Sequence, residues 1–324
     1  MASNIRILFH GNCIDGLACF YLYKKAHAGH TVVGFPVSPN EERTWPQDPE
    51  NIAEWDIVLL DISMPDEILR RWEATARSVR VIDHHATSEA VLTAARPASV
   101  IFSTDRCATF LTYQFLHPGR PIPDWVHMVD RIDRWKDVTF NDRAMREMLH
   151  PMAKLAVQGQ LDLALQQMDS FANLSSRPVS TDLFTFILEG SARLGAKEHY
   201  LNSILSGGRP TAKWTIDEAL ATSWHLPSSW KGTTVFSVDT TGISCFDSTD
   251  ASQMVFDRCP DVTVFVNYIK TSWIRQGHPH SKYKYCVRAR EGVDLTVGGV
   301  FSGHPCAAGD VKQYEGTPLP FIIV

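Results

Sequence analysis

One tripeptide in the sequence, Asp83-His84-His85, combines side chains that could hold a metal ion. It follows the apolar run of residues 79–82, which is typical of a buried strand. In open α/β sheets, ligands bind beyond the carboxyl ends of the strands. Imidazole binds divalent metals well, and a neighbouring carboxylate can accept its second ring N–H and fix its tautomer. The tripeptide therefore indicates metal chemistry if other acidic side chains reach the same edge.

Three further segments place such side chains directly after an apolar run. The runs are residues 5–9, 57–60 and 125–129, and the side chains that follow them are His10, Cys13, Asp15, Asp61, Asp130 and Asp133. Residues 17–26 and the segment that begins at Pro65 are typical of helices, so the apolar runs alternate with predicted helices. Because the carboxyl ends of parallel strands meet at one edge of a sheet, we expect the four segments to form one site.

These residues resemble the motifs of the DHH phosphoesterase superfamily, which includes oligoribonucleases, RecJ-type exonucleases, phosphoadenosine-phosphate phosphatases, cyclic-dinucleotide phosphodiesterases and polyphosphatases. The far end of the chain extends the resemblance. Residues 298–309, GGVFSGHPCAAG, are similar to the GGGHxxAAG signature of the DHHA1 domain, although residues 300–302 interrupt the glycines. Arg288 stands where that family carries a phosphate-binding arginine. The resemblance implies that Arg288, Gly303 and His304 bind the substrate.

The resemblance also implies one or two divalent ions, with Mn²⁺ favoured and Mg²⁺ or Zn²⁺ as alternatives. The positions that match the family's ligands are His10, Asp15, Asp61, His84 and Asp133. Asp133 is favoured over Asp130 because it lies two residues before Trp135, as in family members with an Asp-x-Trp sequence, and the alternative for either acid is a helix cap. His85 is expected to face the substrate as a phosphate ligand or general acid, with Asp83 beside it.

Cys13 departs from the family pattern, which usually has Asp-x-Asp where this chain has Cys13-Ile14-Asp15. A thiolate at this position would favour a softer metal such as zinc or iron. A free cysteine is also commonly a small buried hydrophobic residue. Asn12 could instead contribute a neutral oxygen, or one metal position could be weak or empty. All of these interpretations stay open from the sequence.

The fold class expected from this pattern is α/β, with three parts. Residues 1–150 are predicted to form a DHH domain in which helices cover both faces of a parallel sheet. Residues 151–220 change to a helical pattern and are predicted to connect the domains, and residues 221–324 return to strands and helices, as a smaller DHHA1-like domain. At 324 residues the chain is long enough for two cores.

The composition limits the cellular setting and the partners. No run of about 18 apolar residues is present, so no membrane partner is expected. The first strand begins almost at once, and seven scattered cysteines without a CxxC pair favour free thiols, so the expected location is cytoplasmic. The net charge of −5 gives no broad basic field, which argues against long duplex nucleic acid.

The sequence therefore predicts a metal-dependent phosphoesterase that hydrolyses nucleotides or short oligonucleotides. A cyclic-dinucleotide phosphodiesterase and a polyphosphatase are alternatives within the same chemistry. A non-catalytic protein that binds nucleotide or metal at a degenerate site is the alternative from another class, and a homodimer is possible.

Overall fold

The computed structural model describes residues 3–38, 45–95, 99–175, 181–208, 211–218, 230–243, 247–275, 278–290, 293, 295, 301–304, 307–310 and 314–315. The chain divides into two compact units, Met1–Leu194 and Gly195–Val324. The boundary falls inside helix α8 (Thr181–Ser203), so this helix contributes residues to both units.

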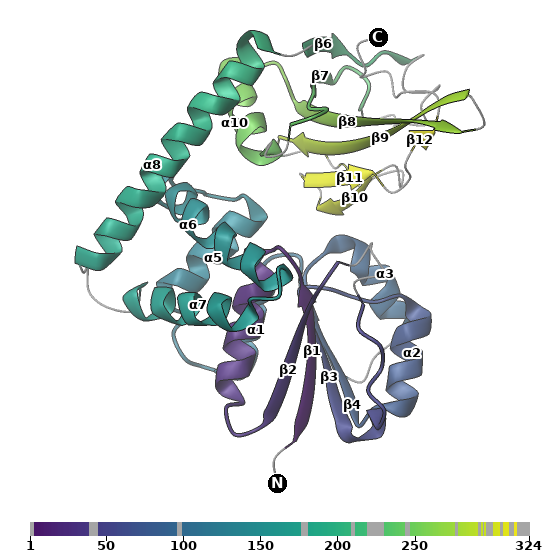
Figure 1. Cartoon of the computed structure of the whole chain (residues 1–324), viewed down its shortest axis with the longest axis vertical. Helices are drawn as coiled ribbons and strands as arrows, with labels where there is room; N and C mark the ends of the chain where they lie inside the picture. Colours follow the sequence, from purple (N-terminus) through teal and green to yellow (C-terminus); the bar gives the residue numbers. More distant parts are fainter. Residues whose placement is uncertain are drawn as a thin grey trace. The chain divides into compact units, whose positions relative to one another are not determined.

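The first unit is built on a five-stranded parallel sheet in the order β2-β1-β3-β4-β5. Figure 1 labels the first four of these strands, β2, β1, β3 and β4. Its strands are β1 (Asn4–His10), β2 (Thr31–Val37), β3 (Trp55–Leu60), β4 (Ser78–Asp83) and β5 (Ser99–Phe102). Its helices are α1 (Ile14–Ala26), the 3₁₀ turn η2 (Ile52–Glu54), α2 (Asp66–Thr75), α3 (Ala86–Ala95), α4 (Ala108–Leu116), α5 (Asp124–Arg134), α6 (Phe140–Val157) and α7 (Leu161–Ser175).

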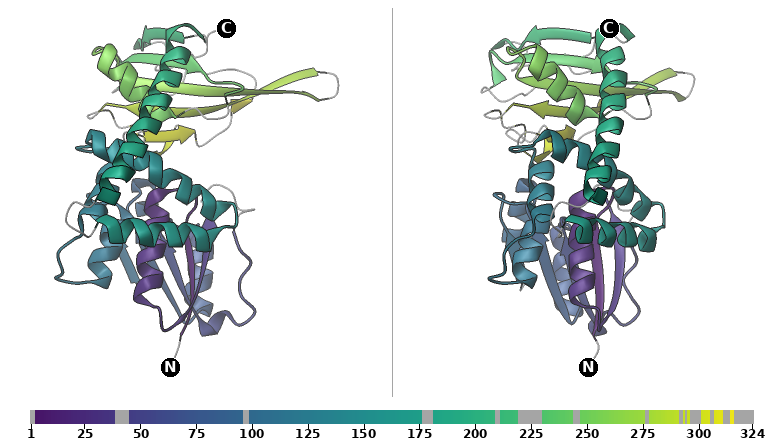
Figure 2. Two further views of the ribbon diagram at one scale, coloured as in Figure 1. Left: turned by 60° about the vertical axis from the view of Figure 1, so that its left-hand side comes forward. Right: turned by 90° about the vertical axis from the view of Figure 1, so that its left-hand side faces the viewer.

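Helices cover both faces of this sheet, as the labelled view and the two turned views show (Figures 1 and 2). Side chains alternate between the faces of a strand. Ile7 and Phe9 of β1 pack into the core under α1 and α4 to α7, whereas Leu8 packs on the opposite face with Leu69 and Trp72 of α2. The predicted doubly covered parallel sheet is therefore confirmed.

The second unit contains a seven-stranded sheet, and among its described residues the end of α8 packs with α10 (Ser248–Arg258). The strands are β6 (Thr211–Thr215), β7 (Thr234–Asp239), β8 (Val264–Arg275), β9 (His278–Ala289), β10 (Phe301–His304), β11 (Ala307–Asp310) and β12 (Tyr314–Glu315). β7 and β8 are parallel and joined by α10, whereas the other pairs are antiparallel. Leu201 near the end of α8 packs with Met254 and Phe265, and a π-helical turn η3 (Ile204–Gly208) follows α8.

The predicted helical connector is divided between the two units. Its first part forms the end of α6 and all of α7, and both helices pack against α1. Gly159 has a φ of +80° in the loop between α6 and α7. No helix within the described ranges has the length and apolar character needed to cross a membrane.

Residues 125–129 require a correction, because they belong to helix α5 and not to a strand. Trp125, Val126, Met128, Val129 and Ile132 are buried, and their spacing fits one face of a helix. A short apolar run cannot by itself distinguish a strand from a buried helix. Asp133 therefore reaches the sheet edge from the last turn of a helix.

Candidate metal centre

The candidate centre lies at the point where the strand order of the parallel sheet reverses. β1 is flanked by β2 on one side and β3 on the other. The chain therefore runs from β1 to β2 in one direction along the sheet and from β2 to β3 in the other. In a sheet of this order, the crevice outside the carboxyl ends at the reversal point binds ligands. His10 is the last residue of β1 and Asp61 directly follows β3, so both residues lie at that point.

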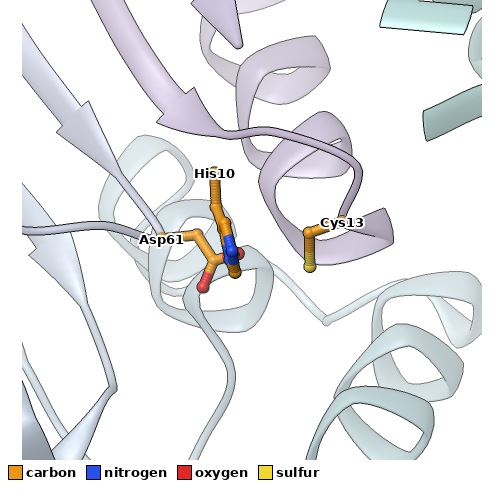
Figure 3. Close-up of side chains that lie close together, drawn as sticks. All are labelled: His10, Cys13 and Asp61. Atoms are coloured by element: carbon orange, nitrogen blue, oxygen red, sulfur yellow. The ribbon is translucent and has the colours of Figure 1, made fainter. Parts of the chain in front are cut away.

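A first group of potential ligands consists of His10, Cys13 and Asp61. Nδ1 of His10 lies 3.3 Å from Oδ2 of Asp61. The sulfur of Cys13, one ring nitrogen of His10 and one oxygen of Asp61 all lie within 4.8 Å of one another. Figure 3 shows the imidazole of His10 beside the carboxylate of Asp61, with Cys13 next to them at the start of α1.

The backbone around this group allows the start of α1 to lie close to the end of β1. A Cβ atom at Gly16 would lie 2.2 Å from the carbonyl oxygen of His10, so only glycine allows α1 to start this close to β1. Asp61 has a φ of +58°, a strained conformation for a non-glycine residue, and its backbone N–H donates to the carbonyl of Ile82 (2.9 Å). Strained residues of this kind cluster at functional sites.

A second group surrounds the imidazole of His84. Its Nε2 lies 3.2 Å from Oδ1 of Asp61, 3.3 Å from Oδ2 of Asp133 and 3.5 Å from Oδ2 of Asp15. Asp61 thus turns one oxygen toward His10 and the other toward His84. The geometry places Asp61 between two groups of ligands, as expected for a bridging carboxylate.

Asp15 is held in place by the start of α4. Its two carboxylate oxygens accept hydrogen bonds from the backbone N–H groups of Ala108 and Thr109, each 2.8 Å long. The Thr109 hydroxyl also donates to the carbonyl of Asp15 (3.0 Å). A helix N-terminus favours a negative charge, so α4 keeps Asp15 beside His84. No sequence motif indicated these contacts.

Asp83 orients His85 instead of joining the ligand groups. Its Oδ1 lies 2.8 Å from Nδ1 of His85 and accepts the backbone N–H of His84 (2.7 Å). Burial alone would lower the pKa of His85, but Asp83 and Asp61 raise it to about 9. Asp83 therefore favours the protonated form of His85 and fixes the direction of its ring.

The structure gives the two acids of α5 different roles. Asp133 joins the His84 group, whereas Asp130, named from the sequence as a second candidate ligand, is engaged elsewhere. One oxygen of Asp130 accepts the backbone N–H of Cys107 (2.7 Å), and the other accepts the guanidinium of Arg106 (2.8 Å). Asp130 therefore fixes the loop before α4 and is corrected to a structural residue.

A bidentate ion pair holds α5 against α6. Arg131 donates to both carboxylate oxygens of Asp142 at 2.6 and 2.8 Å. Asp142 also forms a capping box with Thr139 at the start of α6. Because Arg131 lies two residues before Asp133, this contact positions the turn that carries Asp133. The sequence analysis missed it, although Thr139 followed three residues later by Asp142 is a recognisable capping signal.

The charges of the cluster fit a bound cation. Burial, with the negative charges of Asp61 and Asp133, raises the pKa of Asp15 well above its usual range, and burial also raises the pKa of Asp133. Burial and the same acids raise the pKa of the Cys13 thiol. Burial alone would lower the pKa of His84, but Asp133 and Asp61 raise it to about 10. Burial alone would raise the pKa of Asp61 as well, but the imidazoles of His10 and His84 hold it well below its usual range.

The distances and the hydrogen bonding also fit a metal. Within the described part of the chain, neither oxygen of Asp61 nor Oδ2 of Asp133 has a hydrogen-bond donor in bonding geometry, although Asp61 is only 1% exposed. Ligand atoms about 2.0–2.1 Å from a tetrahedral ion are about 3.3 Å apart. The separations of 3.2–3.5 Å found around His10 and His84 match that spacing.

The residues predicted to bind substrate lie in the second unit. Arg288 of β9 is paired with Ala307 of β11, and Ala307 is paired with His304 of β10, so the three positions form one row across the sheet. Gly303 is the neighbouring position, paired with Ala308. Nε of Arg288 donates to Oγ1 of Thr249 (3.2 Å) at the start of α10. Residues 298–300, 305 and 306 of the glycine-rich signature lie outside the described residues.

Comparison with known proteins identifies the fold. No family model and no curated protein matches the sequence. A solved structure described as the DHH domain of a member of a family of ribosomal proteins is 11% identical, with a TM-score of 0.53 over 96% of this chain and 83% of that one. RecJ from Thermus thermophilus, in complex with Mn²⁺, is 14% identical with a TM-score of 0.48 over 95% and 49% of the two chains. An exopolyphosphatase-related protein from Bacteroides fragilis is 11% identical with a TM-score of 0.42 over 98% and 88%.

The likeness to the first of these structures extends over nearly the whole of this chain. At this low identity, the structural likeness establishes the arrangement of the helices and strands but not the activity. The resemblance seen in the motifs is thus confirmed at the level of the fold, and this chain has the fold of the DHH-domain proteins.

Proposed function

We propose that this protein is a metal-dependent phosphoesterase that hydrolyses phosphodiester or phosphomonoester bonds of nucleotides or short oligonucleotides. The observation that carries the proposal is the position of Asp61 between two groups of buried ligands. Its oxygens lie 3.3 Å from His10 Nδ1 and 3.2 Å from His84 Nε2, which suits a carboxylate shared by two ions.

The first ion would be held by His10, Asp61 and Cys13, and the second by Asp15, Asp61, His84 and Asp133. Divalent ions held by these residues would lower the pKa of a water molecule and neutralise negative charge on a phosphate group. Mn²⁺ is the favoured ion, with Mg²⁺ and Zn²⁺ as alternatives. An oxygen-rich ligand set such as the second group is the kind that binds Mn²⁺ and Mg²⁺.

His85 and Asp83 supply the proton in this proposal. Asp83 accepts the Nδ1–H of His85, which leaves the Nε2 proton as the one that a general acid donates. A leaving alkoxide of a phosphodiester needs such a proton, and Asp83 stabilises the imidazolium until the proton is transferred.

A nucleotide-sized substrate fits the predicted roles in the second unit. Arg288 offers a planar fork for a phosphate, and the backbone register places His304 in the same row of the sheet as Arg288. The net charge of −5 favours a short substrate over a long duplex. A cyclic dinucleotide or polyphosphate would use the same contacts.

A substrate screen tests the proposal. Chelator-treated protein would be supplied with Mn²⁺, Mg²⁺ or Zn²⁺ and offered short RNAs, dinucleotides, cyclic dinucleotides, phosphoadenosine phosphate, polyphosphate and a chromogenic phosphodiester. We expect metal-dependent hydrolysis of at least one nucleotide substrate. Arg288→Ala should raise KM about 10- to 100-fold, because a bidentate charged contact contributes about 1.5–3 kcal/mol, and should leave metal content intact. Metal binding without hydrolysis of any of these substrates would contradict the proposal and favour a binding protein.

A further inference from the structure

The two ligand groups differ in the chemistry of their atoms. The first offers an imidazole nitrogen, a carboxylate oxygen and the thiol sulfur of Cys13. The second, around His84, offers one imidazole nitrogen and oxygens from Asp15, Asp61 and Asp133. Thiolate ligands select zinc and iron, whereas carboxylates suit manganese and magnesium.

We propose that the centre is asymmetric, with Zn²⁺ or Fe²⁺ bound by His10, Cys13 and Asp61, and Mn²⁺ or Mg²⁺ bound by the His84 group. Cys13 binds as a thiolate, and its proton leaves to solvent when the ion enters. This inference rests on the metal-binding part of the proposed function and specifies which ion each position takes.

The surroundings of Cys13 differ from those of the packed cysteines. Cys19 and Cys107 are fully buried and belong to the apolar core of the first unit. Cys13 is only partly buried, lies outside that core and has the carboxylate of Asp61 and the ring of His10 within 4.8 Å of its sulfur. A thiol that served only as a small hydrophobic group would be expected among apolar neighbours.

Asp61 gives an independent sign of a ligand at this position. Its Oδ2 lacks a hydrogen-bond donor within the described ranges, is buried and lies 3.3 Å from Nδ1 of His10. That separation equals the spacing of about 3.3 Å between nitrogen and oxygen ligands of a tetrahedral zinc ion. His10 and Asp61 are therefore placed for one ion, and Cys13 is the third donor that the loop before α1 supplies.

The test uses the full chain, stripped of metal and then supplied with equal amounts of Zn²⁺ and Mn²⁺. X-ray absorption at the zinc edge reports a sulfur ligand directly, because a Zn–S bond is about 2.3 Å long and Zn–N or Zn–O bonds are about 2.0–2.2 Å. Elemental analysis gives the number of each ion bound. The variants are Cys13→Ser and Cys13→Asp, and the matched control is Cys259→Ser, a partly buried cysteine at the end of α10.

We expect one sulfur ligand at zinc in the wild-type protein and in Cys259→Ser, and none in either Cys13 variant. The ratio of zinc to manganese retained by Cys13→Asp should fall at least about 10-fold, because the thiolate is the ligand that favours zinc most and a carboxylate in its place reduces that preference. Circular dichroism of each variant checks that it folds. If Cys13→Ser does not fold, Cys13→Asp and the wild-type spectrum still decide the question.

Zinc bound without sulfur in the wild-type protein would overturn the inference, and so would an unchanged sulfur ligand in Cys13→Ser. The proposed function fails in a different way. A sulfur-ligated zinc in a protein that hydrolyses none of the phosphoester substrates would support the asymmetric centre and reject the phosphoesterase activity. Hydrolysis with two bound manganese ions and no zinc preference would support the phosphoesterase activity and reject the asymmetric centre.

Discussion

The carboxylates at the two ends of strand β3 differ in their hydrogen bonding. At the amino end, Asp56 accepts hydrogen bonds from Nε of Arg77 (2.8 Å) and from the hydroxyl of Ser78 (2.7 Å). At the carboxyl end, the oxygens of Asp61 have no donor in bonding geometry in the part of the chain that the structure describes. In the proposed function, a divalent cation between His10 and His84 would neutralise this buried carboxylate.

Burial alone does not make this distinction, as Asp142 shows. Its side chain is about as buried as that of Asp61, but it accepts two hydrogen bonds from Arg131 and two from Thr139. A fully satisfied buried acid holds elements together, whereas an unsatisfied one at a strand end marks a binding site. Substitution of each acid by asparagine separates these two roles.

The largest effect is expected for Asp61→Asn. Turnover should fall at least about 10³-fold, equivalent to about 4 kcal/mol, because the shared carboxylate would no longer hold the ions. The variant should also lose bound metal, because a neutral amide is a poorer ligand for a divalent ion than a carboxylate. Turnover and elemental analysis measure the two outcomes. Near-normal turnover with unchanged metal content would disprove the bridging role.

Asp142→Asn should lower the stability of the fold and not the rate of the catalysed reaction. Loss of a buried bidentate pair and of a capping box should lower the free energy of unfolding by about 2–4 kcal/mol. Urea unfolding of the wild-type and variant proteins measures the change. If the midpoint is unchanged, the contact does not hold α5 against α6 as we infer.

The same acid predicts a dependence of stability on pH. Burial alone would raise the pKa of Asp142, but the Arg131 guanidinium and the groups of Thr139 hold it below its usual range. A lowered folded-state pKa means that the stabilisation is complete above the unfolded value of about 3.9 and is lost as the pH falls through the folded value. The difference in unfolding free energy between wild type and Asp142→Asn should therefore shrink below about pH 4.

Asp83→Asn should have an intermediate effect. Residues that orient a group of a metal site typically change activity by about 10- to 100-fold when substituted. An asparagine at this position can still accept a backbone N–H but cannot stabilise the His85 imidazolium. Steady-state kinetics with metal analysis should show lower turnover and unchanged metal content, and loss of the metal would assign Asp83 a ligand role instead.

Asp56→Asn should have the smallest effect, although it lies on the same strand as Asp61. The pair of Asp56 with Arg77 is partly exposed, and pairs of this kind contribute up to about 1 kcal/mol. Activity should be unchanged, which makes this variant the control for Asp61→Asn. A loss of turnover comparable to that of Asp61→Asn would remove the distinction between the two ends of β3.

The sheet and most of the centre could be predicted because their signals are local. The apolar runs that end in His10, Asp61 and His84 are strands, and parallel strands bring their carboxyl ends together. β2 gave a weaker signal, because Gly34 and Pro36 are poor strand residues and are tolerated here at the edge of the sheet.

Tertiary contacts decided the rest. Asp130 and Asp133 are three residues apart, and only the positions of Arg106 and Cys107 show that Asp130 is engaged elsewhere. The division at residues 194 and 195 likewise depends on α6 and α7 packing against α1, which no composition change reveals. The predicted domain limits at residues 150 and 220 differ from this division for that reason.

Calorimetric titration of Mn²⁺ into chelator-stripped wild-type, Asp61→Asn and Asp56→Asn proteins measures whether Asp61 is shared between two bound divalent ions. We predict that wild-type and Asp56→Asn proteins bind Mn²⁺ with the same affinity and that Asp61→Asn loses at least about 100-fold. Equal Mn²⁺ binding by all three proteins, or none by the wild-type protein, would contradict the account.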